Sequence, residues 1–462
     1  MKSLDRTFVT RVMGLAVRGL AMICFIGAIF LVGFVSGGTI AARKDNAPLN
    51  YLFRLTGMMS LLYSTNLEIG PLGVHWNPPF TPLEKNRPIT HYEPGRSYPG
   101  VNLLLTGTST GATLVAMDGT ELHRWSRRFD DVWPEPLHIP GYEPGLNMYW
   151  RRAHLFPNGD ILVIFESPDL TPYGLGLAKL DKDSNVLWKF SQNIHHDISV
   201  APDGRIFVLF QEIGDVRYID RRALRAGVGR TPYLKEGVAI LDSAGNLIKK
   251  VYLMDALMNS DFFPLFQTMF FESLQGDFTH MNTVQYIDEP LAKGVAFAKA
   301  GQVLVSMREM NSIAVLDLDE ERVVWSMTGL FQRQHDPQLL PNGHILVFDN
   351  FGNTGPGEGA TRVREIDPTT QTVKWEYKGT KDDPLQSLYF GSEQRLPNGN
   401  TMIVESMNGR VIEVTPGGDV VWQYRVAETR THEGIEYVPV INDMVRFNPN
   451  DLKFLENESS SG

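Results

Sequence analysis

One short phrase occurs four times in this chain: two apolar strands joined by a Pro-Asn-Gly or Pro-Asp-Gly turn. The copies are FPNGDILVIFE (156–166), APDGRIFVLF (201–210), LPNGHILVFDN (340–350) and LPNGNTMIVES (396–406). Asn-Gly and Asp-Gly accept the positive φ angles of a tight turn, so each copy predicts a β-hairpin. A repeated unit of this length indicates a radial or solenoidal array.

Further strands follow the hairpins. A third strand, a polar turn and a strand containing Trp are predicted in GLAKLDKDSNVLWKF (176–190), TRVREIDPTTQTVKWEY (361–377) and GRVIEVTPGGDVVWQY (409–424). Weaker copies of the unit cover residues 103–125 and 300–327. Four strands per unit is the content of a propeller blade, and about six units are present. The sequence therefore predicts an all-β fold, a six-bladed β-propeller.

Composition excludes several classes of protein. The chain has 462 residues, of which 43% are apolar, so it can bury a large core. Its formal charge of −10 argues against a nucleic-acid partner, because such proteins carry a basic surface. The single cysteine, Cys24, lies in the N-terminal apolar stretch. The globular part therefore has no disulfide, no cysteine metal site and no thiol nucleophile.

The N-terminal apolar stretch predicts a single-pass membrane anchor. Residues 19–38 carry no charge, and a helix of about 20 such residues spans the hydrocarbon core. Four basic residues precede it and two follow it: Lys2, Arg6, Arg11 and Arg18, then Arg43 and Lys44. This bias places the propeller on the periplasmic or extracellular side. The alternative is a signal peptide cleaved near residues 39–42.

The expected organisation has four parts. They are a cytoplasmic stub with the transmembrane helix (1–45), a juxtamembrane segment and Pro-rich linker (46–100), the propeller (101–445) and a polar tail (446–462) that we expect to be disordered. Insertions are expected at about 215–236 and 252–279. The second contains MNSDFFPLFQTMFFESL (258–274), which is too aromatic for a naked loop. It is extra core, a substrate lid, a homodimer contact, or a contact with the membrane or a membrane complex.

Aligning the hairpins on their proline predicts a ring of side chains. Six residues before the proline stand Arg151, His196, His335 and Gly391. The first strand of each blade lines the channel of a propeller, so these residues are expected at one mouth, with His280 extending the ring. The second strands return to the same mouth and end with Glu166, Gln211, Arg308, Asn350 and Ser406.

His195 and His196 are alternatives, because adjacent side chains of a strand point to opposite sides. Register with His335 favours His196 in the channel. Asp197 and Asp336 follow their histidines and either bind a ring nitrogen or cap the strand.

The residue types allow two kinds of chemistry. Histidine and aspartate are good ligands for zinc or iron, which would suit a metal-dependent hydrolase. An arginine argues instead for an anion site, in which Arg308 binds sulfate or phosphate oxygens and a histidine acts as nucleophile or acid. No glycine-rich phosphate loop is present, so no nucleotide cofactor is expected. A non-catalytic scaffold anchored at a membrane complex is the third alternative.

At these residues the chain resembles the bacterial arylsulfotransferase family. The matching elements are HHD (195–197), HMN (280–282), Arg308 and QHDPQLLPNGHILVFDNFGN (334–353), within a resemblance that covers about residues 101–440. The chain departs from better-known members in its apparent anchor and in lacking a cysteine pair in the propeller.

The resemblance implies a six-bladed propeller that moves a sulfuryl group from a phenolic sulfate ester to an acceptor phenol, without a cofactor or a nucleotide donor. His335 resembles the nucleophile, which becomes a sulfohistidine. His280, Asn282 and Arg308 resemble the groups that hold the sulfuryl oxygens, and His196, or less favourably His195, resembles the proton-transfer group. Substrate contacts are expected at Asn282, Arg151, Asn350 and Gln211.

Overall fold

The computed structural model describes residues 75–79, 87–139, 142–214, 233–267, 277–350 and 361–459. Every described residue lies in one compact unit, residues 68–462. The expected membrane anchor at residues 19–38 lies outside the described residues. Within the described ranges, no helix is both long and apolar enough to cross a membrane.

Within these ranges the unit contains six antiparallel sheets of four or five strands. Three of them are β28 (Ile441–Phe447) with β3 (Val101–Thr106), β4 (Gly111–Ala116) and β5 (Glu121–Ser126); β6 (Tyr149–Leu155), β7 (Ile161–Glu166), β8 (Gly174–Leu180) and β9 (Val186–Phe190); and β10 (Ile194–Val200), β11 (Ile206–Gly214), β12 (Tyr233–Leu241) and β13 (Leu247–Tyr252). The other three are β14 (Met281–Tyr286), β15 (Val303–Met307), β16 (Ser312–Asp317) and β17 (Arg322–Thr328); β18 (His335–Leu339), β19 (Ile345–Asp349), β20 (Arg362–Asp367) and β21 (Thr372–Tyr377); and β22 (Ser392–Arg395), β23 (Thr401–Glu405), β24 (Arg410–Val414), β25 (Val420–Arg425) and β2 (Ile89–Tyr92).

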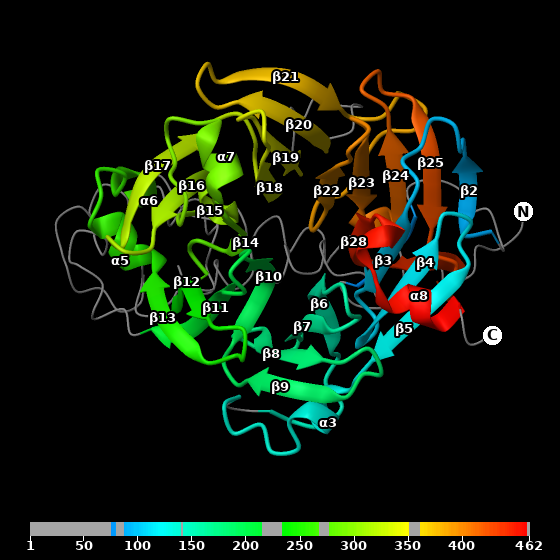
Figure 1. Cartoon of the computed structure of the whole chain (residues 1–462), viewed down its shortest axis with the longest axis horizontal. Helices are drawn as coiled ribbons and strands as arrows, with labels where there is room; N and C mark the ends of the chain where they lie inside the picture. The colour runs from blue at the N-terminus through cyan, green and yellow to red at the C-terminus, as the bar shows by residue number, and fades with distance from the viewer. Residues whose placement is uncertain are drawn as a thin grey trace, which may run out of the picture. The chain divides into compact units, whose positions relative to one another are not determined.

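These sheets form a propeller-like array. Figure 1 shows them around a common centre, with β28, β6, β10, β14, β18 and β22 innermost. The C-terminal strand β28 pairs with β3, from Ile441 opposite Thr106 to Phe447 opposite Val101. One sheet therefore combines strands from both ends of the described chain, which closes the array.

The four hairpins predicted from the repeated phrase are confirmed. They are β6–β7, β10–β11, β18–β19 and β22–β23. The glycine of each turn, Gly159, Gly204, Gly343 or Gly399, has a φ between +84° and +89°. A side chain would be strained in this left-handed conformation, so the turn requires glycine.

The core lies between neighbouring sheets. Leu162 and Ile164 of β7, for example, are fully buried in one cluster with Val208 and Phe210 of β11. The innermost strands also bind one another through side chains. Ser199 Oγ accepts from the Tyr286 amide at 2.9 Å. These side chains satisfy backbone groups that no neighbouring strand can reach, which fixes each sheet against the next.

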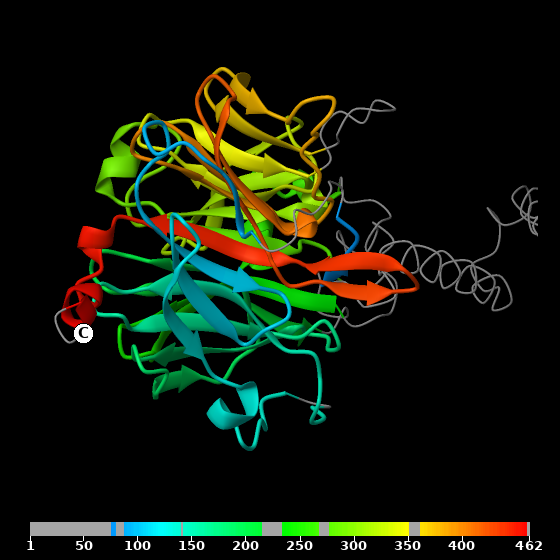
Figure 2. The ribbon, with the colours of Figure 1, turned by 90° about the vertical axis from the view of Figure 1, so that its right-hand side faces the viewer.

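The expected linker is partly built into sheets. β1 (Trp76–Asn77) joins β27 (Ile435–Pro439) and β26 (Arg430–His432) in a three-stranded sheet, and β2 is the fifth strand beside β25. In Figure 2 the β26–β27 hairpin projects from one end of the array, whereas the C-terminal helix lies at the other.

The expectation of a disordered tail is wrong for the described residues. Pro449–Asp451 forms a 3₁₀ turn, η4, and Phe454–Ser459 forms helix α8. Leu452 and Phe454 are buried, and the Phe454 ring lies 5.8 Å from that of Trp125. Together with the half-buried Leu455, these side chains hold the otherwise polar segment against the core.

The apolar insertion packs in part against the sheets. It contains α5 (Leu253–Met258) and α6 (Pro264–Gln267). Phe262, Phe263 and Leu265 lie half-buried against the core cluster that includes Leu253 and Leu257 of α5, which favours the extra-core alternative for this part. Residues 268–276, and 215–232 of the other insertion, lie outside the described residues. The remaining short helices are α3 (Phe129–Val132), α7 (Glu289–Lys293), η2 (Arg308–Met310) and η3 (Ser406–Asn408).

Candidate active site

β-Bulges near the start of the innermost strands build the site. The pairing register shifts between Trp150 and Ala153, His195 and Ile198, Met281 and Thr283, His335 and Gln338, and Ile441 and Asp443. A bulge bends a strand and redirects the side chains of its extra residues. Here it brings two consecutive side chains toward the centre, where a regular strand would offer one.

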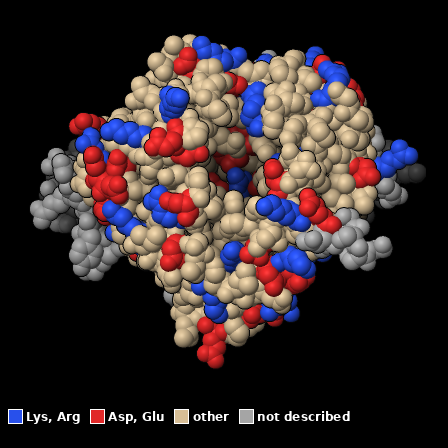
Figure 3. Space-filling view, viewed as in Figure 1, with Lys and Arg blue, Asp and Glu red and all other residues tan. Residues whose placement is uncertain are grey.

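The bulged residues and Gly391 line a small cavity that is partly open to solvent, and the empty space within it and at its mouth is about 230 Å³. Its lining is formed by Arg151, Arg152, His196, Asp197, Asn282, His335, Asp336, Gly391 and Asn442. All four residues aligned six positions before the proline are among them, so the structure brings together the ring that the hairpin alignment predicts. Figure 3 shows a hollow near the centre of the view in which acidic and basic atoms lie side by side.

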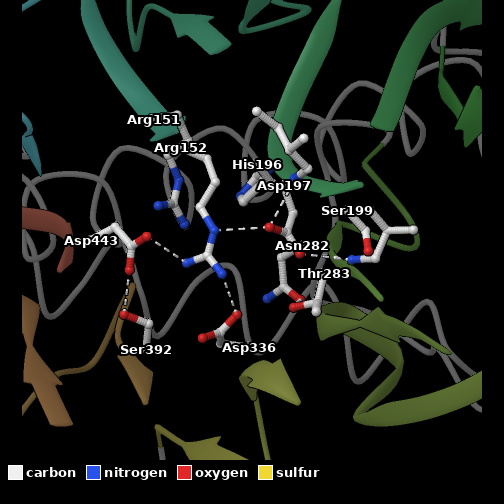
Figure 4. A network of polar contacts seen from close by, with 12 residues as sticks. Arg151, Arg152, His196, Asp197, Ser199, Asn282, Thr283, Asp336, Ser392 and Asp443 are labelled. Carbon is white, nitrogen blue, oxygen red and sulfur yellow. Dashed lines mark hydrogen bonds and ion pairs between the residues drawn. The ribbon is translucent and has the colours of Figure 1, made fainter. Parts of the chain in front are cut away.

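Arg152 is the hub of the innermost strands (Figure 4). Its Nε lies 2.9 Å from Asp197 Oδ1, its Nη2 2.9 Å from Asp336 Oδ1 and its Nη1 3.0 Å from Asp443 Oδ2. Ser392 Oγ donates to Asp443 at 2.8 Å, which adds a fifth strand. We call Arg152 with Asp197, Asp336 and Asp443 the Arg152 hub.

The hub carries more acid than base. Three carboxylates share one guanidinium, and burial raises the pKa of Asp336 to about 7 and also raises that of Asp197. Glu393 lies nearby with both carboxyl oxygens buried and without a hydrogen bond. Burial and the Asp336 carboxylate raise its pKa well above the usual value, which keeps Glu393 neutral.

His335 is held as a neutral imidazole with a defined tautomer. Its Nδ1 lies 2.7 Å from Asn350 Oδ1. Asn350 Nδ2 donates to the carbonyls of Ser387 and Phe390 at 2.8 and 2.7 Å, so the amide oxygen faces the ring. Nδ1 must therefore carry the proton, and Nε2 keeps its lone pair. Burial and the Arg308 charge hold the pKa of His335 well below its ordinary value.

The surroundings of His280 favour the protonated form of its ring instead. Its Nδ1 lies 2.6 Å from Asp277 Oδ2. Burial opposes the charge, but the Asp277 carboxylate outweighs it and raises the pKa of His280. The His280 ring centroid is 5.1 Å from that of His196, so a ring with a raised pKa lies beside the cavity lining.

His196 lines the cavity, whereas His195 is fully buried behind it. The two Nδ1 atoms are 2.9 Å apart, and the His196 amide donates to Glu166 Oε1 at 2.7 Å. His196 has a φ of 56°, a left-handed conformation that the bulge imposes. Burial lowers the pKa of His195 to about 3 and that of His196 well below 6.5, so both rings are neutral.

Two other arginines approach the histidines. Arg151 Nη1 donates to the Asn442 carbonyl at 3.1 Å, and its guanidinium stacks over the Phe390 ring at 5.1 Å. Its Nε is buried without a hydrogen bond. Arg308 begins η2 and pairs with Glu309. It is outside the set of residues that line the cavity, and it acts on His335 through its charge.

The remaining expected substrate contacts differ in position. Asn282 lines the cavity and donates from Nδ2 to the Gln334 carbonyl at 2.8 Å. Asn350 holds His335 from behind. Gln211 is buried in a separate network, where it donates to Glu236 Oε1 at 3.0 Å.

Sequence reasoning missed Arg152, Asp277 and Asp443. The first had a signal: Arg152, Asp197, Asp336 and Ser392 all stand five residues before the hairpin proline, one position after the predicted ring. Asp277 lies three residues before His280, outside any repeated strand, and carried no such signal.

Groups that could hold a metal are absent from the described ranges: no cluster of three or more histidine, cysteine, aspartate or glutamate side chains has a suitable arrangement. In the Arg152 hub the guanidinium occupies the position between the three carboxylates that a metal ion would need.

Comparison with known proteins identifies a family to which the sequence is similar. A family model described as Arylsulfotransferase (ASST) matches residues 152–427. Among solved structures, a Bacteroides caccae protein of unknown function is similar at 12% identity and TM-score 0.46, covering 76% of this chain and 99% of its own. A streptogramin B lyase is similar at 9% identity and TM-score 0.40, with 80% and 97% covered. The WD40 propeller domain of Doa1 gives the same identity and score, with 80% and 96% covered.

No curated protein matches the chain. The matched family segment covers more than half of the sequence and contains His196, His280, Arg308 and His335. The chain belongs to the arylsulfotransferase family.

Proposed function

We propose that this protein transfers a sulfuryl group from a phenolic sulfate ester to an acceptor phenol through a sulfohistidine on His335, without a nucleotide donor. Family membership supports aryl sulfotransfer in general. The observation that carries the proposed mechanism is the hydrogen bond between His335 Nδ1 and Asn350 Oδ1. It leaves a buried, neutral imidazole with its Nε2 lone pair available at the cavity.

In the first half-reaction, the Nε2 lone pair attacks sulfur and forms an N–S bond. The S–O bond to the aryl group breaks, and its electron pair leaves with the phenolate oxygen. His280 is the proposed acid, because the Asp277 carboxylate keeps its ring protonated. The proton passes to the phenolate, and the donor leaves as a phenol.

In the second half-reaction, the acceptor phenol loses its proton to the now neutral His280. The phenolate oxygen attacks sulfur, the N–S bond breaks, and its electron pair returns to Nε2 of His335. Both arginines near the histidines offset the negative charge on the sulfuryl oxygens. His196 contributes shape and hydrogen bonding in this proposal, since burial keeps its ring neutral.

We further infer that the six large sheets are the blades of a six-bladed β-propeller closed by β28. The charge bias around residues 19–38 supports a single-pass anchor with the propeller on the periplasmic or extracellular side. Proteolysis of spheroplasts expressing the full chain tests this placement: the propeller is expected to be cleaved, and its protection would contradict the orientation.

The test of the mechanism is the covalent intermediate. The protein is mixed briefly with 4-nitrophenyl sulfate, and its peptides are mapped by mass spectrometry under neutral conditions. We expect one added SO₃ on the peptide that contains His335, and its loss after phenol is added. Release of 4-nitrophenol without any adduct on that peptide would reject the sulfohistidine.

A further inference from the structure

The cavity lining contains one guanidinium, that of Arg151, that is placed to bind an anion. Arg151 is 5% exposed, lines the cavity, and has a buried Nε with no hydrogen-bond partner among the described residues. The nearest carboxylate oxygen, Glu166 Oε2, is 4.0 Å away. A buried guanidinium N–H left without an acceptor is costly, so an acceptor supplied by a ligand oxygen would satisfy it.

Another part of the same lining is acidic. Asp197 and Asp336 belong to the lining and to the Arg152 hub, where three carboxylates surround a single guanidinium. Arg152 is therefore already neutralised by its three partners. Since His196 and His335 are neutral, they add no positive charge to balance these carboxylates. The two other cationic side chains near the histidines, His280 and Arg308, each have a carboxylate partner of their own, Asp277 and Glu309.

This arrangement distinguishes anions by charge. A sulfate monoester carries one negative charge, whereas a phosphate monoester carries about two above its second pKa of about 6. Both have a tetrahedral centre with three terminal oxygens. In a buried site, an added unit charge close to carboxylates raises the free energy of binding strongly, because the local dielectric constant is low.

We propose that Asp197 and Asp336 are specificity-determining residues that admit a singly charged tetrahedral ester and reject the doubly charged aryl phosphate of the same shape. This inference rests on the proposed function, because it assigns the sulfuryl end of the donor to the cavity. Arg151 binds the terminal oxygens, and the two carboxylates set the charge that the cavity tolerates.

Two unreactive probes of nearly the same shape separate the effect of ligand charge on binding from that of ligand shape. 4-Nitrophenyl phosphate is a dianion at pH 8, and 4-nitrophenyl methylphosphonate is a monoanion of nearly the same shape. Their affinities for the purified full chain are measured by titration calorimetry. We expect the methylphosphonate to bind at least about tenfold more tightly. Equal affinities, tighter binding of the phosphate, or no binding of either probe would overturn the inference.

The variants Asp336→Asn and Asp197→Asn test the assignment to these residues. Each removes one negative charge and keeps the shape, so we expect the affinity ratio of the two probes to fall to about threefold or less. A merely structural disturbance would weaken both probes together and leave the ratio unchanged. An unchanged ratio in both variants would overturn the assignment.

Asp419→Asn is the matched control, because Asp419 is an exposed partner of Arg96 on the outer surface. It should leave the ratio at the wild-type value. The calorimetry needs no turnover, so it is independent of the adduct experiment. Sulfation of His335 without charge discrimination would reject this inference alone, whereas discrimination without sulfation would reject the sulfohistidine mechanism alone.

Discussion

His335 begins β18 and His280 directly precedes the neighbouring innermost strand β14, yet their surroundings shift the pKa values of the two rings in opposite directions. The partner of His335 Nδ1 is an amide oxygen, whereas the partner of His280 Nδ1 is a carboxylate. Burial lowers the pKa of the first ring far below its ordinary value, while Asp277 raises that of the second. The comparison teaches that burial lowers the pKa of a ring unless a carboxylate lies behind it, and in the proposed mechanism this difference separates the attacking histidine from the proton donor.

The largest expected effect is at the attacking ring. His335→Ala should lower the rate of sulfuryl transfer by at least about a thousandfold, because no other group replaces the N–S bond. The measurement is release of 4-nitrophenol from 4-nitrophenyl sulfate with phenol as acceptor. His344→Ala, which removes a histidine paired with Glu365 in the same sheet, should retain most activity. Activity in His335→Ala equal to this control would remove His335 from the mechanism.

The second effect tests whether the surroundings of His335 and His280 differ in what they contribute to the stability of the fold. Asp336, the residue that follows His335, belongs to the Arg152 hub. Neither sequence neighbour of His280 belongs to it. Arg152→Met should lower the free energy of unfolding at pH 7 by about 3 kcal/mol, because three buried carboxylates lose their shared cation. Urea unfolding followed by fluorescence measures this change. A loss below about 0.5 kcal/mol, as expected for an exposed arginine such as Arg96, would mean that the hub does not hold the innermost strands together.

The third effect concerns the proton. Asp277→Asn should lower the pKa of His280, so the imidazolium is lost at a lower pH and the falling limb of the rate moves toward acid. At pH 8 the rate with phenyl sulfate should fall by about a hundredfold. The rate with 4-nitrophenyl sulfate should fall less, because 4-nitrophenolate leaves without a proton. Asp255→Asn, at an exposed carboxylate, is the control. Equal losses for both donors would contradict the acid role.

The smallest effect is expected from a substitution that gives His335 the kind of partner that His280 has. Asn350→Asp puts a carboxylate behind His335 and should raise the pKa of that ring. The protonated ring cannot attack sulfur, so the rate should fall by about tenfold at pH 6 and recover as the pH rises through the new pKa. A pH–rate profile of kcat/KM checks this. A profile that coincides with that of the wild type would show that Asn350 does not control the ring.

Much of the site is predictable because the hairpin repeats. The turn glycines fix the register, and the register alone is enough to place Arg151, His196, His335 and Gly391 around one cavity. The next position in the same alignment holds Arg152 and two of the hub carboxylates, but a regular strand would point them away from the centre. Only the bulges, which add a residue to the strand, bring both positions to the cavity.

Other features had no repeat to reveal them. Asp277 lies outside the strands, and nothing in its spacing marks it as the partner of His280. The tail departs from the expectation because Leu452, Phe454 and Leu455 are three apolar residues in a polar segment, and only their position in the cluster that contains Trp125 makes them part of the core. The strands β1 and β2 likewise form because the edges that they join come from residues far along the chain.

The sequence by itself determined the hairpins, the sheet content and the family, since turn glycines and alternating apolar residues act locally and recur in every unit. The tertiary structure decided the charges. Whether a histidine is neutral or protonated depends on burial and on a partner atom brought near by folding, and the same is true of the three aspartates that share Arg152. Electrostatic energies depend on distance and dielectric environment, and neither is a property of the chain before it folds.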